Sequence, residues 1–226
     1  MSQSNVDSSA RAVSVEACGH SPVLQTHFGN FEFGMVSVPD GTCGDWSVET
    51  FSISAEEARF SNMRAAFGGR AYAMVSPGTY KRLVHERRGV VMSNTPMEVN
   101  QARSAYRQAT GRILVNGLGL GMILEGMLSK PVVTAVRVVE IDADVLELVG
   151  SHFHSDPRVE LVHADAYSYS PAKGERFDYV WHDIWDQITP DNLPLMTKLT
   201  RKYARRTERQ AAWAREECRM HARRGR

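Results

Sequence analysis

The sequence predicts an α/β protein in which a parallel β-sheet is covered by helices on both faces and is preceded by a small β-rich region. From Arg112 onward, short apolar runs alternate with helical stretches, a pattern typical of strands buried on both faces. A glycine-rich turn joins the first run to an apolar helix, and acidic residues follow the later runs. Only 40 residues follow Asp186, so we expect a sheet shortened at its C-terminal side.

The N-terminal region alternates short apolar stretches with Gly and Pro. Ser54 and Glu57 have the spacing of a helix capping box. Thr95, Pro96 and Glu98 combine an N-cap, Pro at the first helical position and an acidic third position. We therefore expect strands over 31–38 and 90–92, helices over 54–67 and 96–108, and a turn or short helix after 78.

The strongest motif is a glycine-rich bend after the apolar run Ile113–Val115. Gly117, Gly119 and Gly121 let the backbone turn sharply and let a ligand approach without an intervening side chain. The apolar helix that follows offers free backbone N–H groups and the positive end of its dipole. We expect these three glycines to bind a cofactor.

Carboxylates stand at the ends of the next two apolar runs. Glu140, 19 residues after Gly121, can accept hydrogen bonds from both hydroxyls of a ribose. Alternatively, it is an N-terminal charge of the next helix, with Asp142 as the cap. Asp165 can accept a hydrogen bond from an adenine amino group while the N–H of Ala166 serves a ring nitrogen; alternatively, Asp165 caps the following turn. Carboxyl ends of parallel strands meet at one edge of a sheet, so the motifs together predict a nucleoside site.

In order and spacing these motifs resemble those of class I S-adenosylmethionine methyltransferases. The matching segments are Gly117–Gly121, Glu140–Asp142, Ala164–Ala166 and Phe177–Val180. Within that superfamily the likeness is strongest to spermidine synthase-like proteins. Those proteins share the Asp-Pro-Arg-Val sequence found at Asp156–Val159 and a pair of aspartates matched by Asp183 and Asp186. The likeness covers residues 112–186, a third of the chain.

The resemblance implies a Rossmann-like fold and S-adenosylmethionine as the cofactor, with decarboxylated S-adenosylmethionine as the alternative. Leu120 stands where spermidine synthases carry an aspartate that faces the aminopropyl group. Ile184 and Trp185 replace the two serines that those enzymes tend to have. Both differences count against aminopropyl transfer. Methyltransferases usually carry an acidic residue at the position of Asn116, whose amide can still hydrogen-bond the cofactor.

Methyl transfer requires an aligned acceptor and, where the acceptor holds a proton, a base. Asp183 is the first candidate for the base or for a carboxylate that orients an amine, and Asp186 is the second. The two together could bind a cationic amine substrate. His182 competes as a base, although strand alternation points it away from Asp183. Trp181 and Trp185 either form walls of a substrate pocket or pack under a C-terminal helix.

Charge is unevenly distributed along the chain. Lys198–Arg226 holds eleven basic and three acidic residues, whereas the rest holds 16 and 23. We expect this basic segment to be a helix that binds nucleic acid or pairs with the acidic body. Three functions remain open: a methyltransferase of unknown acceptor, a spermidine synthase-like aminopropyltransferase, and a non-catalytic protein that binds nucleic acid through its basic tail.

Cysteine usage and the lack of long apolar runs indicate a cytoplasmic protein. Cys18, Cys43 and Cys218 lie far apart and not in metal-ligand pairs, so we expect free thiols and no metal site. No apolar run approaches the roughly 18 residues of a membrane span, and no secretory signal is visible. An uncovered sheet edge would favour a homo-oligomer. We expect a disordered tail over 1–20, an N-terminal α+β region over 21–108, a cofactor-binding Rossmann-like domain over 109–190 and a basic C-terminal helix over 191–226.

Overall fold

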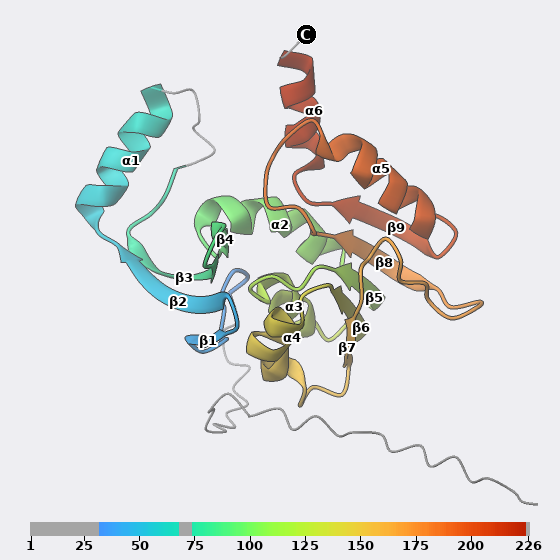
Figure 1. Cartoon of the computed structure of the whole chain (residues 1–226). Helices are drawn as coiled ribbons and strands as arrows, with labels where there is room; N and C mark the ends of the chain where they lie inside the picture. Colours follow the sequence, from blue (N-terminus) through green and yellow to red (C-terminus); the bar gives the residue numbers. More distant parts are fainter. Residues whose placement is uncertain (1–31, 68–73, 225–226) are drawn as a thin grey trace, which may run out of the picture.

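The computed structural model describes residues 32–67 and 74–224. Two β-sheets adjoin one another in it (Figure 1). The expected tail over 1–20 lies outside the described residues, as does Phe31.

The N-terminal elements form an antiparallel sheet in the order β1-β2-β3-β4. The capping box is confirmed, because Ser54 Oγ accepts from the N–H of Glu57 and the Glu57 carboxylate accepts from Ser54 N at 2.8 Å. The helix before the parallel sheet has the predicted bounds. The elements are β1 (Gly41–Cys43), β2 (Trp46–Ile53), α1 (Ala55–Phe67), β3 (Gly78–His85), β4 (Gly89–Ser93) and α2 (Pro96–Gln108).

Two of the N-terminal expectations are wrong. Residues 32–38 form no strand, because the chain turns at Phe33 and at Gly34, which has a φ of +111°. Phe33 is buried there and stacks on Tyr106 of α2 at 4.3 Å between ring centroids. Gly78 starts strand β3 rather than a turn or helix, because β3 pairs with the whole length of β2.

The second sheet has five parallel strands in the order β7-β6-β5-β8-β9, so β5 is central. The chain starts at β5, moves outward to β6 and β7, and then returns to β8 on the other side of β5. This reversal is the switch point of a doubly wound sheet, and it confirms the Rossmann-like fold class. The elements are β5 (Gly111–Asn116), α3 (Met122–Leu128), β6 (Val133–Glu140), α4 (Ala143–Leu148), β7 (Val159–His163), β8 (Phe177–His182), α5 (Asn192–Tyr203), β9 (Thr207–Ala212) and α6 (Arg215–Arg224).

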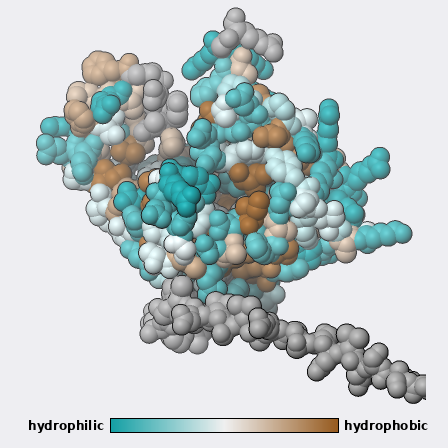
Figure 2. All heavy atoms as spheres, in the orientation of Figure 1, coloured by the Kyte–Doolittle hydropathy of each residue, from teal (hydrophilic) through white to brown (hydrophobic). Residues whose placement is uncertain are grey.

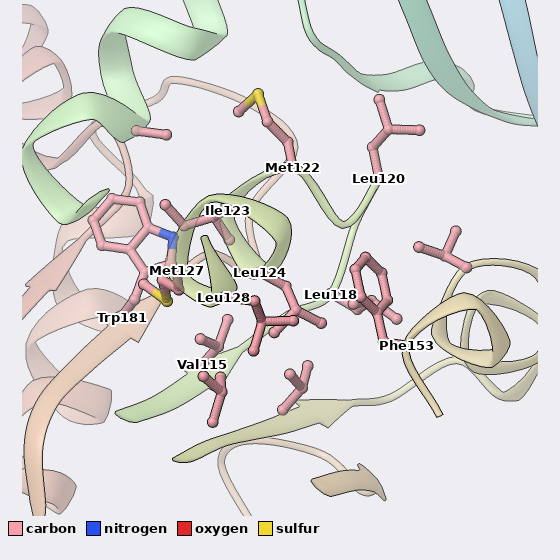
Figure 3. Close-up of a cluster of buried hydrophobic side chains, with 14 of the residues drawn as sticks. Val115, Leu118, Leu120, Met122, Ile123, Leu124, Met127, Leu128, Phe153 and Trp181 are labelled. Carbon is pink, nitrogen blue, oxygen red and sulfur yellow. The ribbon is translucent and has the colours of Figure 1, made fainter. Parts of the chain in front are cut away.

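Helices cover both faces of the parallel sheet. Val115 faces the larger core cluster, in which the apolar side chains of α3 and Trp181 are buried (Figure 3). The preceding residue, Leu114, points to the opposite face and packs with Leu199 and Tyr203 of α5. Alternation along one central strand therefore anchors two helical layers.

The expected basic C-terminal helix over 191–226 is wrong in its described part, residues 191–224. Strand β9 separates α5 from α6 and pairs with β8, where Trp181 stands opposite Ala211. The sequence of β9, Thr-Glu-Arg-Gln-Ala-Ala, is rich in helix-forming residues, so pairing with β8 overrides the local preference. Among the described residues, no helix combines the length and the apolar character that crossing a membrane demands.

Candidate functional site

A cavity of about 500 Å³ lies at the carboxyl ends of β5, β6, β7 and β8. This is the edge of the sheet at which ligands of doubly wound proteins bind, and the volume suits a small molecule. The wall of the cavity opposite these strand ends is formed by the N-terminal sheet, its β3–β4 turn and α2. These parts contribute Trp46, Leu83, Arg88 and Glu98. The two halves of the molecule therefore enclose the site together.

The glycine-rich bend forms the floor of the cavity. Gly117, Gly119 and Gly121 have φ values of +95°, +53° and +78°, in the left-handed region that favours glycine. A Cβ on Gly117 would overlap the backbone carbonyl oxygen of Asp183, and one on Gly119 would lie 2.6 Å from Sδ of Met92. Gly117 and Gly119 line the cavity, whereas Gly121 packs against the Phe153 ring outside the lining.

Glu140 ties this bend to the end of β6. Its Oε2 accepts from the N–H of Leu118 at 2.7 Å, and its Oε1 accepts from Ile141 and Asp142 at 2.8 and 3.0 Å. The side chain is 8% exposed and lines the cavity. Since each carboxylate oxygen has two lone pairs, Oε2 keeps one that can accept from a ligand hydroxyl.

Replacing Glu140 by Gln is expected to destabilise the protein by about 2 kcal/mol, because the new NH₂ group would face backbone N–H donors and leave at least one buried donor unpaired. Urea unfolding followed by tryptophan fluorescence measures the loss. Glu208→Gln, on an exposed position of β9, is the control and should change stability little. Equal stabilities of the two variants would contradict this structural role of Glu140.

Asp142 is the helix cap that the sequence suggested. Its Oδ1 accepts from the N–H groups of Asp144 and Val145 at the start of α4. Its Oδ2 accepts from Nε1 of Trp46 at 2.8 Å, which joins the N-terminal sheet to the end of β6. Glu140 is therefore free of the capping role.

Asp165 and Ala166 line the cavity beyond the end of β7. Asp165 Oδ1 accepts from the N–H of Tyr167 at 2.9 Å, as expected for a residue that caps a turn. The described residues supply no hydrogen bond to its Oδ2. The capping and ligand-binding interpretations are thus compatible, because each uses a different oxygen.

Asn116 is fully buried and lies outside the cavity lining. Its Nδ2 lies 2.8 Å from Nδ1 of His182, and Nε2 of His182 lies 3.0 Å from Oε1 of Gln210. Because Gln210 donates its own Nε2 to Thr200, its Oε1 accepts, and the His182 proton is therefore assigned to Nε2. Burial lowers the pKa of His182 to about 4. His182 thus links β5, β8 and β9 as a neutral side chain, which is unsuited to act as a base at the cavity.

Asp183 lines the cavity, and Asp186 lies at its rim. Burial raises the pKa of Asp183 to about 7, opposed by a hydrogen bond from Trp181 Nε1 at 3.3 Å and reinforced by the charges of Glu98 and Glu140. A carboxyl group that titrates near neutral pH is suited to accept a proton. Trp181 is buried in the core behind Asp183, whereas Trp185 lines the cavity.

Sequence reasoning missed the contributions of the N-terminal half. Glu98 was interpreted only as a helix-start signal, yet it lines the cavity and accepts from the N–H and hydroxyl of Ser93. Burial raises the pKa of Glu98 despite these bonds. Trp46 and Arg88 also line the cavity, as does Trp213 from the C-terminal part of the chain, and no motif spacing marks them. Within the described residues, no group of three or more His, Cys, Asp or Glu side chains is placed to hold a metal ion.

The strand order and the cavity beyond the strand ends define a Rossmann-like α/β protein. No family model matches the sequence. A protein named polyamine aminopropyltransferase 2, from Ralstonia nicotianae, is 34% identical over 84 residues, which cover 33% of this chain and 16% of that protein. The chain therefore spans about a sixth of the length of this curated relative.

Solved structures with similar folds include proteins named as methyltransferases. The 23S rRNA methyltransferase ErmE is 18% identical, with 50% of this chain and 43% of that chain covered and a TM-score of 0.39. The N-terminal domain of EvdMO1 with SAH bound is 23% identical over 45% of this chain and 44% of that chain, with a TM-score of 0.37. Spermidine synthase from Thermotoga maritima is 22% identical over 45% of this chain and 42% of that chain, with a TM-score of 0.34.

Proposed function

We propose that this protein binds S-adenosylmethionine in the cavity and is a methyltransferase. One observation carries the proposal: Glu140, Asp165 and the Gly117–Gly119 bend come from the ends of three adjacent strands and line the same cavity. Their order along the sheet matches the parts of the cofactor. The bend would take the methionine end, Glu140 the ribose and Asp165 the adenine amino group.

The residues that line the cavity suit such a cofactor in shape and chemistry. Ile141 is 65% exposed although it is a large apolar side chain lining the cavity, and an adenine ring would cover it. Oε2 of Glu140 and Oδ2 of Asp165 keep acceptor capacity, as described above. Of the residues that the structure describes, six carboxyl groups and one cation line the cavity, which suits a ligand with a positive sulfonium.

Side chains of the cavity would align the methyl acceptor and accept a proton from it. When bound, the cofactor supplies an activated methyl group. Asp183 would accept a proton on Oδ1 while Trp181 Nε1 holds Oδ2. Glu98 and Trp213 also line the cavity, where they would orient the acceptor and exclude water.

Isothermal titration of the full chain with S-adenosylhomocysteine tests the proposal. We expect saturable binding that Asp165→Asn weakens about tenfold, because the substitution removes an acceptor for the adenine amino group. Asp191→Asn, at the exposed N-terminus of α5 and outside the cavity lining, should bind as the wild type does. Absence of binding by the wild type would refute the proposed cofactor.

Aminopropyl transfer is less well supported. Leu120 occupies the position of the acidic residue that spermidine synthases carry, and it is fully buried outside the cavity lining. The loop therefore presents no carboxylate to an aminopropyl group. This observation favours the carboxylated cofactor over its decarboxylated form.

Nucleic acid binding through the basic C-terminal region is a second candidate function. Lys198, Arg201 and Arg205 are exposed and recur every three or four residues along α5 and its end. Hydrophilic side chains project from this part of the surface (Figure 2). Binding of a fluorescent RNA that weakens steeply with salt in the wild type, and not in a triple Gln variant of these residues, would support it.

A further inference from the structure

A cofactor carboxylate would enter an acidic cavity whose floor offers few free donors. Of the five N–H groups from Gly117 to Gly121, four already donate within the protein. Their acceptors are Val139 O, Glu140 Oε2, Met92 Sδ and Leu118 O. Among the described residues, only the N–H of Gly119 in this bend has no acceptor. A cationic side chain on the opposite wall would add the full positive charge that the backbone donors of the bend and of α3 lack.

In the part of the chain that the structure describes, Arg88 is the only cation that lines the cavity, beside six carboxyl groups. It lies in the turn between β3 and β4, where its N–H donates to the carbonyl oxygen of His85 at 3.2 Å. The turn holds the residue at the cavity mouth.

Two contacts position the Arg88 guanidinium at the cavity. Its Cζ lies 4.8 Å from the centroid of the Trp46 ring, and Trp46 is hydrogen-bonded to Asp142 after β6. Its Nη1 lies 4.0 Å from Oδ2 of Asp186, which follows β8. In the sheet β5 lies between β6 and β8, and Gly117, which begins the bend after β5, lines the same cavity as Arg88.

The donors of Arg88 are largely unused. A guanidinium has five N–H donors, and the described residues offer this one only the distant Asp186 contact and the face of Trp46. The side chain is 48% exposed. The contact with the Trp46 ring restrains the guanidinium and leaves donors free for a planar anion.

We infer that Arg88 binds the methionine carboxylate of the cofactor and selects S-adenosylmethionine over its decarboxylated form. The inference rests on the proposed function and extends it to a specificity-determining residue. A bidentate Arg–carboxylate pair supplies both charge and geometry. With a decarboxylated ligand, which keeps only its positive groups, the same guanidinium would be a repulsive neighbour.

Isothermal titration with two probes tests this role: S-adenosylhomocysteine and S-adenosyl-3-thiopropylamine, which lacks only the carboxylate. In Arg88→Gln we expect S-adenosylhomocysteine to bind at least about tenfold more weakly, since a charge-assisted pair is lost. The decarboxylated probe should bind as well as before or more tightly. Arg87→Gln is the matched control. The Arg87 side chain, next to Arg88 in the sequence, is 81% exposed, pairs with Asp45 and lies outside the cavity lining. The affinities of this variant for the two probes should therefore equal those of the wild type.

The outcomes separate this inference from the proposed function. An equal loss for both probes in Arg88→Gln would show that Arg88 only shapes the wall, and an unchanged affinity for S-adenosylhomocysteine would show that it does not contact the carboxylate. Either result overturns the inference while leaving the cofactor in place. Failure of the wild type to bind both probes would overturn the proposed function and the inference together.

Discussion

Gly117→Ala is expected to destabilise the protein by about 4 kcal/mol, a large part of the stability of an ordinary domain. The new Cβ would overlap the backbone carbonyl oxygen of Asp183. That carbonyl cannot move aside easily, because the N–H of Asp183 donates to Asn116 O at 2.8 Å and extends the pairing of β5 with β8. The φ of +95° at Gly117 adds backbone strain. Urea unfolding followed by circular dichroism measures the loss.

Gly174→Ala separates the clash from the strain. Gly174 has a similar φ of +84°, yet a Cβ there would have no atom within 4 Å. Its replacement should cost only about 1 kcal/mol, the strain of a left-handed alanine. If the two variants lose similar stability, the close approach of Asp183 to Gly117 is not what requires glycine at the bend.

The sequence was sufficient to predict the central part of the fold. Strands β5, β6 and β8 are buried on both faces, so their apolar runs stand out from the flanking helices. The glycine-rich bend and Glu140 are local signals, because each directly follows or ends an apolar run that can be recognised as a strand without knowledge of the rest of the fold. The three positive φ values of the bend confirm the backbone interpretation of its glycines.

Features that depend on tertiary contacts could not be predicted from the sequence. Strand β9 has helix-forming residues and becomes a strand only by pairing with β8. Asn116 looked like a ligand-binding residue, but its partner His182 holds it inside the sheet. Glu98 and Arg88 reach the cavity because the N-terminal sheet and α2 fold over the strand ends, and a single sequence carries no signal for that packing.

Asp183→Asn is expected to make the protein more stable at neutral and alkaline pH. The pKa of Asp183 is about 7 in the folded protein, raised chiefly by burial, against about 4 in an unfolded chain. Between these values the folded state binds more protons than the unfolded state, so stability falls as the pH rises from about 4 through 7. Above pH 7 the buried charge costs the wild type about 4 kcal/mol, and asparagine never acquires that charge. The difference in unfolding free energy between wild type and variant, measured in urea from pH 4 to pH 8, should therefore grow with pH.

Asp186→Asn provides the control, because it removes an aspartate three positions along the chain that lies exposed at the rim. Because this variant keeps Asp183, its stability should fall with rising pH as that of the wild type does. A flat profile for Asp183→Asn as well would mean that Asp183 is already ionised at pH 5, and a carboxylate of that kind is a poor proton acceptor at neutral pH. A rising profile would instead show that the protein keeps a destabilising acid at the cavity, as expected where a residue is retained for its chemistry rather than for stability.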